Sequence, residues 1–281
     1  MFSGFLDRFH RALARSQIAM TIVRKIQNQC LRIIQCRFGP SAKFHANGEV
    51  LLIARLAPAL KIVFDVGANV GDWTAEVRRL SACCIHVFEC NPQLMGGLEK
   101  RFENDEDVYV NPFGMGDIEE TRRFQFSARS SELGAIDYVR TWAPGTKTLD
   151  VKSVDVQLST VDEYCNERAI DYIDLLKVDT EGNDFHVLRG ARRMIAGRRI
   201  RIIQFEYGEG WRSAGATLFH CVEWLKAADY RTYVLMPAGL EDCDLTRWGE
   251  FFGYCNCVAI PSDAVENDQL PFVHRELKAS R

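Results

Sequence analysis

The sequence predicts an α/β fold: a doubly wound sheet of about seven mostly parallel strands, with helices on both faces and a helical arm at the amino end. Three observations predict it. Short apolar runs rich in β-branched residues alternate with stretches of helical periodicity between about residues 48 and 260. A glycine-rich turn follows the first of these runs, which is typical of sheets that bind a ligand beyond the carboxyl ends of their strands. The first 40 residues stand apart, with seven Arg or Lys and one acidic residue.

The alternation can be followed along the chain. We expect strands over residues 61–66, 84–88, 108–111, 173–178, 200–205, 231–235 and 252–260, and helices over residues 48–56, 73–80, 93–102, 159–168, 184–196 and 219–228. Residues 119–160 are more polar and are predicted to form a loop or hairpin insertion. Strands that alternate with helices of about ten residues favour a mostly parallel sheet.

The composition is that of a globular protein in a reducing compartment. A chain of 281 residues suffices for one sizeable domain. The formal net charge of −3 argues against a general nucleic-acid binder, so no nucleic-acid partner is expected. No apolar run reaches the ~18 residues of a membrane span. The ten cysteines show no paired Cys-x-x-Cys spacing, so we expect free thiols, a cytoplasmic location and no assigned metal site.

We divide the chain into a basic amphipathic helical arm over residues 1–40, an α/β domain over residues 41–262 and a polar tail over residues 263–281. The apolar residues of the arm recur at helical spacing: Phe2, Phe5, Leu6, Phe9 and Leu13, then Ile18, Ile22 and Ile26. Two interpretations stay open. The arm packs on the domain, or it makes a peripheral contact with the anionic inner face of a membrane. An organellar transit peptide would have the same Arg-rich, acid-poor composition.

The turn at residues 64–72 is the predicted ligand-binding loop. Gly67 and Gly71 allow the backbone to turn tightly and to approach a ligand closely. Asp65, at the end of the preceding strand, can order the loop or reach an ammonium group through water. The next strand ends in Glu89, 18 residues beyond Gly71, where a carboxylate can accept hydrogen bonds from both hydroxyls of a ribose.

The charges around this turn favour S-adenosyl-L-methionine over a dinucleotide. A dinucleotide fingerprint needs Gly-x-Gly-x-x-Gly, and Asn69 stands at its middle glycine. Asp65 and Asp72 would repel a pyrophosphate, whereas they favour a sulfonium and an ammonium group. Asp117, after the third strand, could meet the adenine amino group. An NAD-dependent oxidoreductase is the alternative function. A purely structural interpretation is also open, in which the glycines satisfy the geometry of the turn and the acids cap the helix that follows.

Five stretches between about residues 62 and 205 resemble the FkbM family of methyltransferases. They are FDVGANVG at 64–71, VFECNP at 87–92, NPFGMGD at 111–117, SSEL at 130–133 and LKVDTEGNDFHVLRGA at 176–191. The last is the most specific, since generic methyltransferases lack it. The chain departs from the family where Cys90 and Asn91 precede Pro92, and where the DVEGxE core stands as DTEGND at 179–184. Both departures retain the acids.

The resemblance implies a Rossmann-like class I methyltransferase sheet and O-methylation of a hydroxyl, of a sugar in a cell-surface glycan or of a secondary metabolite. The expected partner is therefore a small-molecule or glycan acceptor, whose identity the resemblance does not give; the oligomeric state stays open. A scaffold that kept the fold without activity is a third hypothesis. Intact Asp65, Glu89 and Asp179 argue against it.

Methyl transfer to an alcohol needs in-line alignment and a base for the departing proton. Asp179 is the first candidate, because it follows the fourth strand beside the cofactor loop; Glu181 and His186 are the second. These three could instead bind a divalent ion, although nothing in their spacing requires one, and a lone helical histidine is commonly structural. Glu206 ends the fifth strand, where it could touch substrate. Lys177 lies in a buried strand, where its ammonium needs an acidic partner.

Overall fold

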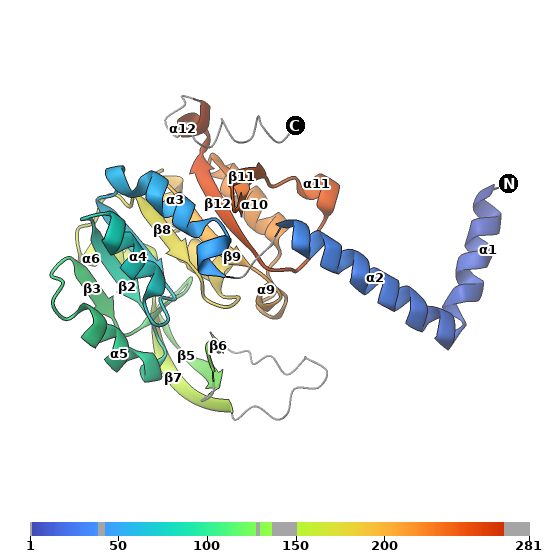
Figure 1. Cartoon of the computed structure of the whole chain (residues 1–281), viewed down its shortest axis with the longest axis horizontal. Helices are drawn as coiled ribbons and strands as arrows, with labels where there is room; N and C mark the ends of the chain where they lie inside the picture. Colours follow the sequence, from blue (N-terminus) through green and yellow to red (C-terminus); the bar gives the residue numbers. More distant parts are fainter. Residues whose placement is uncertain (1, 39–42, 128–129, 137–150, 267–281) are drawn as a thin grey trace.

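The computed structural model of the chain describes residues 2–38, 43–127, 130–136 and 151–266. Its centre is an eight-stranded sheet (Figure 1). In chain order its strands are β1 (Ile62–Val66), β2 (Cys84–Phe88), β3 (Val108–Asn111), β8 (Leu175–Val178), β9 (Ile203–Tyr207), β10 (Tyr230–Met236), β11 (Gly239–Asp242) and β12 (Cys255–Pro261). The predicted doubly wound α/β sheet is confirmed. It has one strand more than expected, because β11 adds an antiparallel edge to β10.

The strand order is β11-β10-β12-β9-β8-β1-β2-β3. The strands from β3 to β9 are parallel, and β12 runs antiparallel to both of its neighbours. From β1 the chain builds the sheet first toward β3 and later toward β9, so the strand order reverses at β1. In open α/β sheets, ligands bind at such a reversal, beyond the carboxyl ends of the strands.

Helices cover both faces of this sheet. On one face pack α3 (Glu49–Leu56), α4 (Asp72–Leu80) and α5 (Pro92–Phe102), and on the other α6 (Val161–Glu167), α7 (Asp184–Gly190), α8 (Arg192–Ala196) and α10 (Leu218–Ala227). Successive side chains of a strand point to opposite faces. Accordingly Val63 of β1 packs in the apolar cluster beneath α3, α4 and α5, whereas Phe64 packs in the apolar cluster on the opposite face of the sheet. Burial on both faces explains why these strands are continuous apolar runs in the sequence.

The prediction of a loop or hairpin over residues 119–160 is incomplete, because part of this segment forms a second sheet. Its strands are β4 (Gly114–Met115), β5 (Glu120–Ser127), β6 (Ser130–Ile136) and β7 (Val151–Ser159), in the order β4-β7-β5-β6. Phe124, Phe126, Val156 and Leu158 form a small core on one of its faces. Polar residues alternate with these apolar ones, so the segment looks polar in the sequence although one face is buried.

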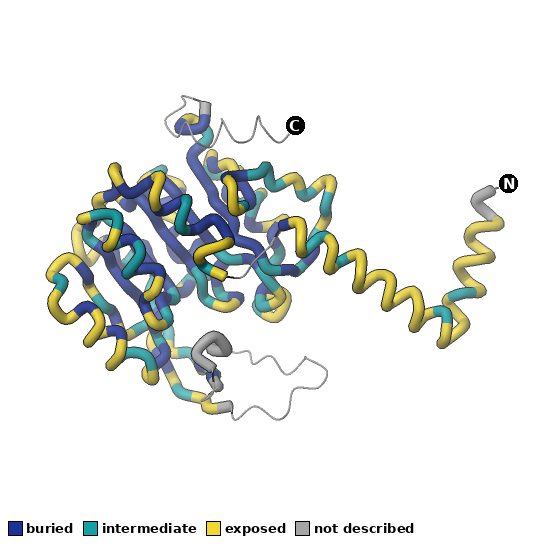
Figure 2. Tube along the Cα trace, viewed as in Figure 1, coloured by how far each residue is buried: buried dark blue, intermediate teal, exposed yellow. Residues whose placement is uncertain are grey.

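The arm consists of α1 (Phe2–Ala14) and α2 (Gln17–Phe38), which project from the domain with most of their surface exposed (Figures 1 and 2). The last turns of α2 contact the domain. Phe38 is buried, with its ring centroid 5.1 Å from that of Phe251 and 5.2 Å from that of Trp248. Arg37 pairs with Glu241 at 2.5 Å. Within the described residues, no helix combines the length and the apolar character needed to cross a membrane.

Replacing Phe38 by Ala tests this anchorage of α2. The substitution removes a buried aromatic ring, which typically costs about 3–5 kcal/mol, so we expect the free energy of unfolding in urea to fall by about 3 kcal/mol. Ile33→Ala, at an exposed position of the same helix, is the matched control and should change stability by less than about 0.5 kcal/mol. Equal stabilities of the two variants would show that α2 is not anchored through Phe38.

Candidate active site

A pocket of about 1030 Å³ opens at the carboxyl ends of the central strands, where the strand order reverses. The turns after β1, β2, β8 and β9 bound it, together with α3, the second sheet and the last turns of α2. Among the described residues, ten with acidic or basic side chains line it: Arg32, Lys43, Glu49, Asp72, Glu89, Asp179, Glu181, Asp184, Glu206 and Glu209. Eight of these ten are acidic, so the pocket suits a cationic ligand better than an anionic one.

The backbone of the turn after β1 forms part of the pocket wall. Gly67 has a φ of +79°, and a Cβ there would lie 1.8 Å from the carbonyl oxygen of Asp179. Only glycine fits this approach. Asn69 also has a positive φ, of +52°, and its side-chain oxygen is buried without a hydrogen-bond partner among the described residues. Gly71, at φ +83°, caps α4 and faces α5, and it does not line the pocket.

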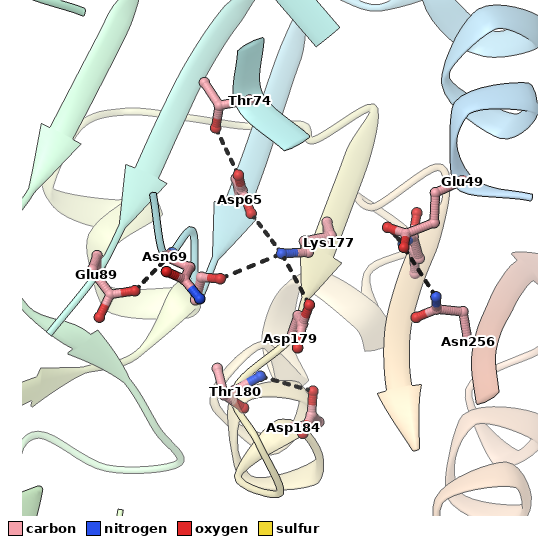
Figure 3. Close-up of polar contacts among 12 residues, drawn as sticks. Glu49, Asp65, Asn69, Thr74, Glu89, Lys177, Asp179, Thr180, Asp184 and Asn256 are labelled. Carbon is pink, nitrogen blue, oxygen red and sulfur yellow. Dashed lines mark hydrogen bonds and ion pairs between the residues drawn. The ribbon is translucent and has the colours of Figure 1, made fainter. Parts of the chain in front are cut away.

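Glu89 holds a carboxylate in the pocket wall just after β2, with 8% of its surface exposed. The backbone amides of Asn69 and Asn91 donate to its two oxygens at 2.8 and 2.7 Å. Figure 3 shows the contact with Asn69. Burial raises the pKa of Glu89, and these two donors partly oppose the rise. A carboxylate oxygen carries more than one lone pair, so both oxygens can still accept hydrogen bonds from a ligand.

Lys177 of β8 is buried behind the pocket wall among carboxylates. Its Nζ lies 3.0 Å from Asp65 Oδ1 and 3.5 Å from Asp179 Oδ2, and it donates to the carbonyl oxygen of Gly67 at 3.4 Å (Figure 3). Burial alone would lower the pKa of Lys177, but the neighbouring carboxylates, Asp65 first, hold it above its ordinary value. The ammonium thereby links β1, β8 and the glycine turn.

Asp65 lies behind the pocket wall, in contact with Lys177. The side chain is fully buried and does not line the pocket. Lys177 engages one of its oxygens, and Thr74 Oγ1 donates to the other at 2.6 Å. The contact with a cofactor ammonium through water stays a prediction. Ordering of the loop fits this position, and it acts through Lys177 on the carbonyl oxygen of Gly67.

Asp179, the first catalytic candidate, lines the pocket with 36% of its side chain exposed. Glu206 of β9 also lines the pocket and is hydrogen-bonded to Asp179. Burial raises the pKa of Glu206 well above its ordinary value, and the charges of Asp179 and Glu181 raise it further. The raised pKa of Glu206 reflects how closely it lies to the other acidic groups on this side of the pocket. Glu181, the second candidate, lines the same side of the pocket at a φ of +55°.

Asp184 closes the turn between β8 and α7. It accepts hydrogen bonds from the backbone amides of Thr180 at 3.2 Å and Gly182 at 3.1 Å. Figure 3 shows the contact with Thr180. Burial raises the pKa of Asp184 to about 7, and the charge of Asp179 contributes to the rise. This geometry matches the structural role expected for an acid that opens a helix.

Glu49 of α3 is a pocket residue that the sequence analysis missed. It is buried and accepts hydrogen bonds from the side-chain amides of Asn47 at 2.5 Å, Gln204 at 2.7 Å and Asn256 at 3.1 Å. Figure 3 shows the contact with Asn256. Burial raises the pKa of Glu49, and Lys177 opposes the rise. A signal was present in the sequence: Gln204 and Asn256 interrupt apolar strands, and a buried amide needs a polar partner.

Asp117 and His186, predicted as an adenine contact and a catalytic residue, do not line the pocket. Asp117 pairs with Arg189 and lies 3.4 Å from Nδ1 of His186. Burial opposes ionisation of Asp117, but Arg189 and His186 outweigh it and hold its pKa below the ordinary value. Nε2 of His186 lies 3.4 Å from the carbonyl oxygen of Ala214. The structure therefore places these two side chains outside the pocket, paired with each other and with Arg189.

The alternative metal set of Asp179, Glu181 and His186 is not brought together. In the parts of the chain that the structure describes, no three His, Cys, Asp or Glu side chains are arranged to hold a metal ion.

The family model of the methyltransferase FkbM domain matches residues 65–232. The chain belongs to the FkbM methyltransferase family. The match begins in β1 and reaches β10, and it contains the glycine turn, Glu89, Asp179 and Glu206. The resemblance found in the sequence motifs is thereby confirmed, and the enzyme class is methyltransferase.

Solved structures give weaker likenesses. An rRNA methylase from Streptococcus thermophilus has 11% identity and a TM-score of 0.43, over 75% of this chain and 93% of that one. Precorrin-6y C5,15-methyltransferase from Geobacter metallireducens has 13% identity and a TM-score of 0.38, over 75% and 87%. The N-methyltransferase NodS from Bradyrhizobium japonicum has 9% identity and a TM-score of 0.40, over 75% and 91%. No curated protein matches significantly. The family assignment rests on the FkbM match.

Lys177→Met tests the role of the buried ammonium. Removing one partner of a buried ion pair costs about 3–5 kcal/mol, so we expect the free energy of unfolding to fall by that amount. The double variant D65N/K177M removes both charges and should recover a large part of the loss. Arg231→Ala, which breaks the exposed pair with Asp242, should cost less than about 1 kcal/mol in the same urea titration. A Lys177→Met variant no less stable than Arg231→Ala would contradict the proposed support.

Proposed function

We propose that this FkbM methyltransferase uses S-adenosyl-L-methionine to methylate a hydroxyl oxygen, on a sugar of a cell-surface glycan or on a secondary metabolite. The observation that carries the proposal is the charge of the pocket, where eight of the ten charged lining residues are acidic. S-adenosyl-L-methionine carries a sulfonium and an ammonium group, which such walls attract. The pyrophosphate of NAD would be repelled by the same walls, which disfavours the oxidoreductase alternative.

Three residues around the glycine turn are suited to hold the nucleoside. Gly67 lets the backbone approach closely, and the unpartnered Oδ1 of Asn69 offers an acceptor within the pocket wall. Glu89 is held by two backbone amides and retains lone pairs on both oxygens for the two ribose hydroxyls. Asp65 and Gly71 support this turn from behind and do not line the pocket.

The pocket has room for an acceptor beside the nucleoside. Its volume of about 1030 Å³ lies at the upper end of the roughly 300–1,000 Å³ range of small-molecule sites. When bound, the cofactor would supply a methyl group to the acceptor oxygen: the carbon–oxygen bond would form in line with the carbon–sulfur bond that breaks, and the sulfur would leave as the neutral thioether of S-adenosylhomocysteine. Asp179 is suited to accept the hydrogen bond of the acceptor hydroxyl, which aims the oxygen, and then to take its proton. Lys177, whose Nζ lies 3.5 Å from Oδ2 of Asp179, and the neighbouring Glu206 hold this side chain in place.

Glu89→Gln tests the nucleoside site. Loss of charge-assisted hydrogen bonds of about 1.5–3 kcal/mol should weaken binding of S-adenosylhomocysteine by roughly 10- to 100-fold in calorimetry. Glu99→Gln, on the exposed side of α5, is the matched control and should bind like the wild type. Absence of binding by the folded wild-type chain would overturn the proposed cofactor. Equal affinities of both variants would remove Glu89 from the site.

Asp179→Asn tests the acceptor side. We expect transfer of label from methyl-labelled S-adenosyl-L-methionine to a carbohydrate and metabolite extract to fall by at least about 100-fold, the lower range of general-base contributions. Binding of S-adenosylhomocysteine should stay within about threefold of the wild type, because Asp179 is not expected to hold the nucleoside. Acid hydrolysis and mass spectrometry of the labelled product should give an O-methyl compound. Label found on nitrogen would refute O-methylation.

A further inference from the structure

The arm exposes two apolar faces that no described part of the chain covers. Phe5, Leu6 and Phe9 of α1 are 47–65% exposed, and they lie within two turns of one another. On α2 the exposed apolar stripe consists of Ile18, Ile22, Ile26 and Ile33, which are 54–76% exposed. Isolated surface leucines or isoleucines are ordinary, but a stripe of four on one helix marks an interaction surface.

This isoleucine stripe is not the face by which α2 packs on the domain. The packing side chains are Phe38, which is buried, and Ile34, which is half-buried against the same core. At 3.6 residues per turn, the isoleucine stripe is centred roughly 135° around the helix from these two residues. Closer docking of α2 on the domain would therefore leave the isoleucine stripe exposed.

The charge of the arm indicates what covers the isoleucine stripe. Seven Arg or Lys and one acid, Asp7, lie in residues 2–38, and α2 carries no acid at all. Two copies that met through their arms would bring these cations together, which is unfavourable. An anionic lipid surface offers apolar depth for the isoleucines and phenylalanines, and counter-charges for the basic residues.

We propose that α1 and the isoleucine stripe of α2 lie in the interface of an anionic lipid bilayer. The carboxyl-terminal turns of α2 form part of the pocket, since Arg32, Gln35 and Cys36 line it. One continuous helix thus joins the lipid-binding surface to the pocket, and it holds the pocket beside the membrane. The bilayer contact itself does not depend on the proposed function. A second inference, that the enzyme takes its acceptors from the membrane surface, does rest on the proposed function.

Vesicle flotation with the full chain tests the proposal. We expect binding to vesicles of phosphatidylcholine with 25% phosphatidylserine, at least tenfold stronger than to pure phosphatidylcholine, with a decrease at high salt. The double variant I22E/I26E should lose at least tenfold of this binding. The matched control Q27E/N28E makes the same charge change on exposed positions off the isoleucine stripe, and it should stay within about threefold of the wild type.

Three results would overturn the lipid assignment. The first is failure of the wild type to float with anionic vesicles, and the second is equal loss in the two double variants. The third is a wild-type oligomer in sedimentation that becomes monomeric in I22E/I26E without any vesicle binding, which would make the isoleucine stripe an interface between copies. S-adenosylhomocysteine binding, measured on I22E/I26E without lipid, should equal that of the wild type. This readout separates failure of the arm proposal from failure of the proposed function.

Discussion

The buried ammonium of Lys177 is the interaction on which the candidate site depends. A buried cation is costly unless carboxylates and hydrogen-bond acceptors surround it. Lys177 finds Asp65 on β1, Asp179 at the end of its own strand, and the carbonyl oxygen of Gly67 in the glycine turn. These contacts fix the two strands at which the strand order reverses and the turn between β1 and α4. The contacts that compensate the buried charge of Lys177 therefore also set the geometry of the pocket floor.

The same cation governs the charge state of the pocket. Burial raises the pKa values of Glu49, Glu89 and Glu206. Lys177 opposes the rise for the first two, and both also accept amide hydrogen bonds that favour the ionised form. For Glu206, burial and the neighbouring charges of Asp179 and Glu181 act in the same direction and raise its pKa well above the ordinary value. Neighbouring acids of one pocket thus have different environments, which separates their pKa values.

The sequence predicted the central strands and the helices that cover them, because a sheet buried on both faces produces continuous apolar runs between helical patterns. It also predicted Gly67 and Glu89, whose positions are set by local strand-turn-helix geometry. It did not show that Asp117 and His186 lie outside the pocket, because the pairing of Asp117 with Arg189 joins segments that are 72 residues apart. Glu49 was missed for the same reason. Its partners Gln204 and Asn256 lie on β9 and β12, and no local pattern relates them to α3.

The pocket is composite, and its two sides have different origins in the chain. Gly67, Asn69 and Glu89 lie inside the segment that matches the family, and they are fixed by backbone hydrogen bonds and by a positive φ. Arg32 and Tyr254 lie outside that segment, on α2 and before β12. Glu49 connects the two sides. Its carboxylate accepts hydrogen bonds from Gln204 and Asn256 on adjacent strands. It also accepts one from Asn47, whose amide donates in addition to the hydroxyl of Tyr254. A change in how α2 or α3 docks would therefore reshape the outer wall and leave the glycine turn in place, since the contacts of Lys177 hold that turn independently.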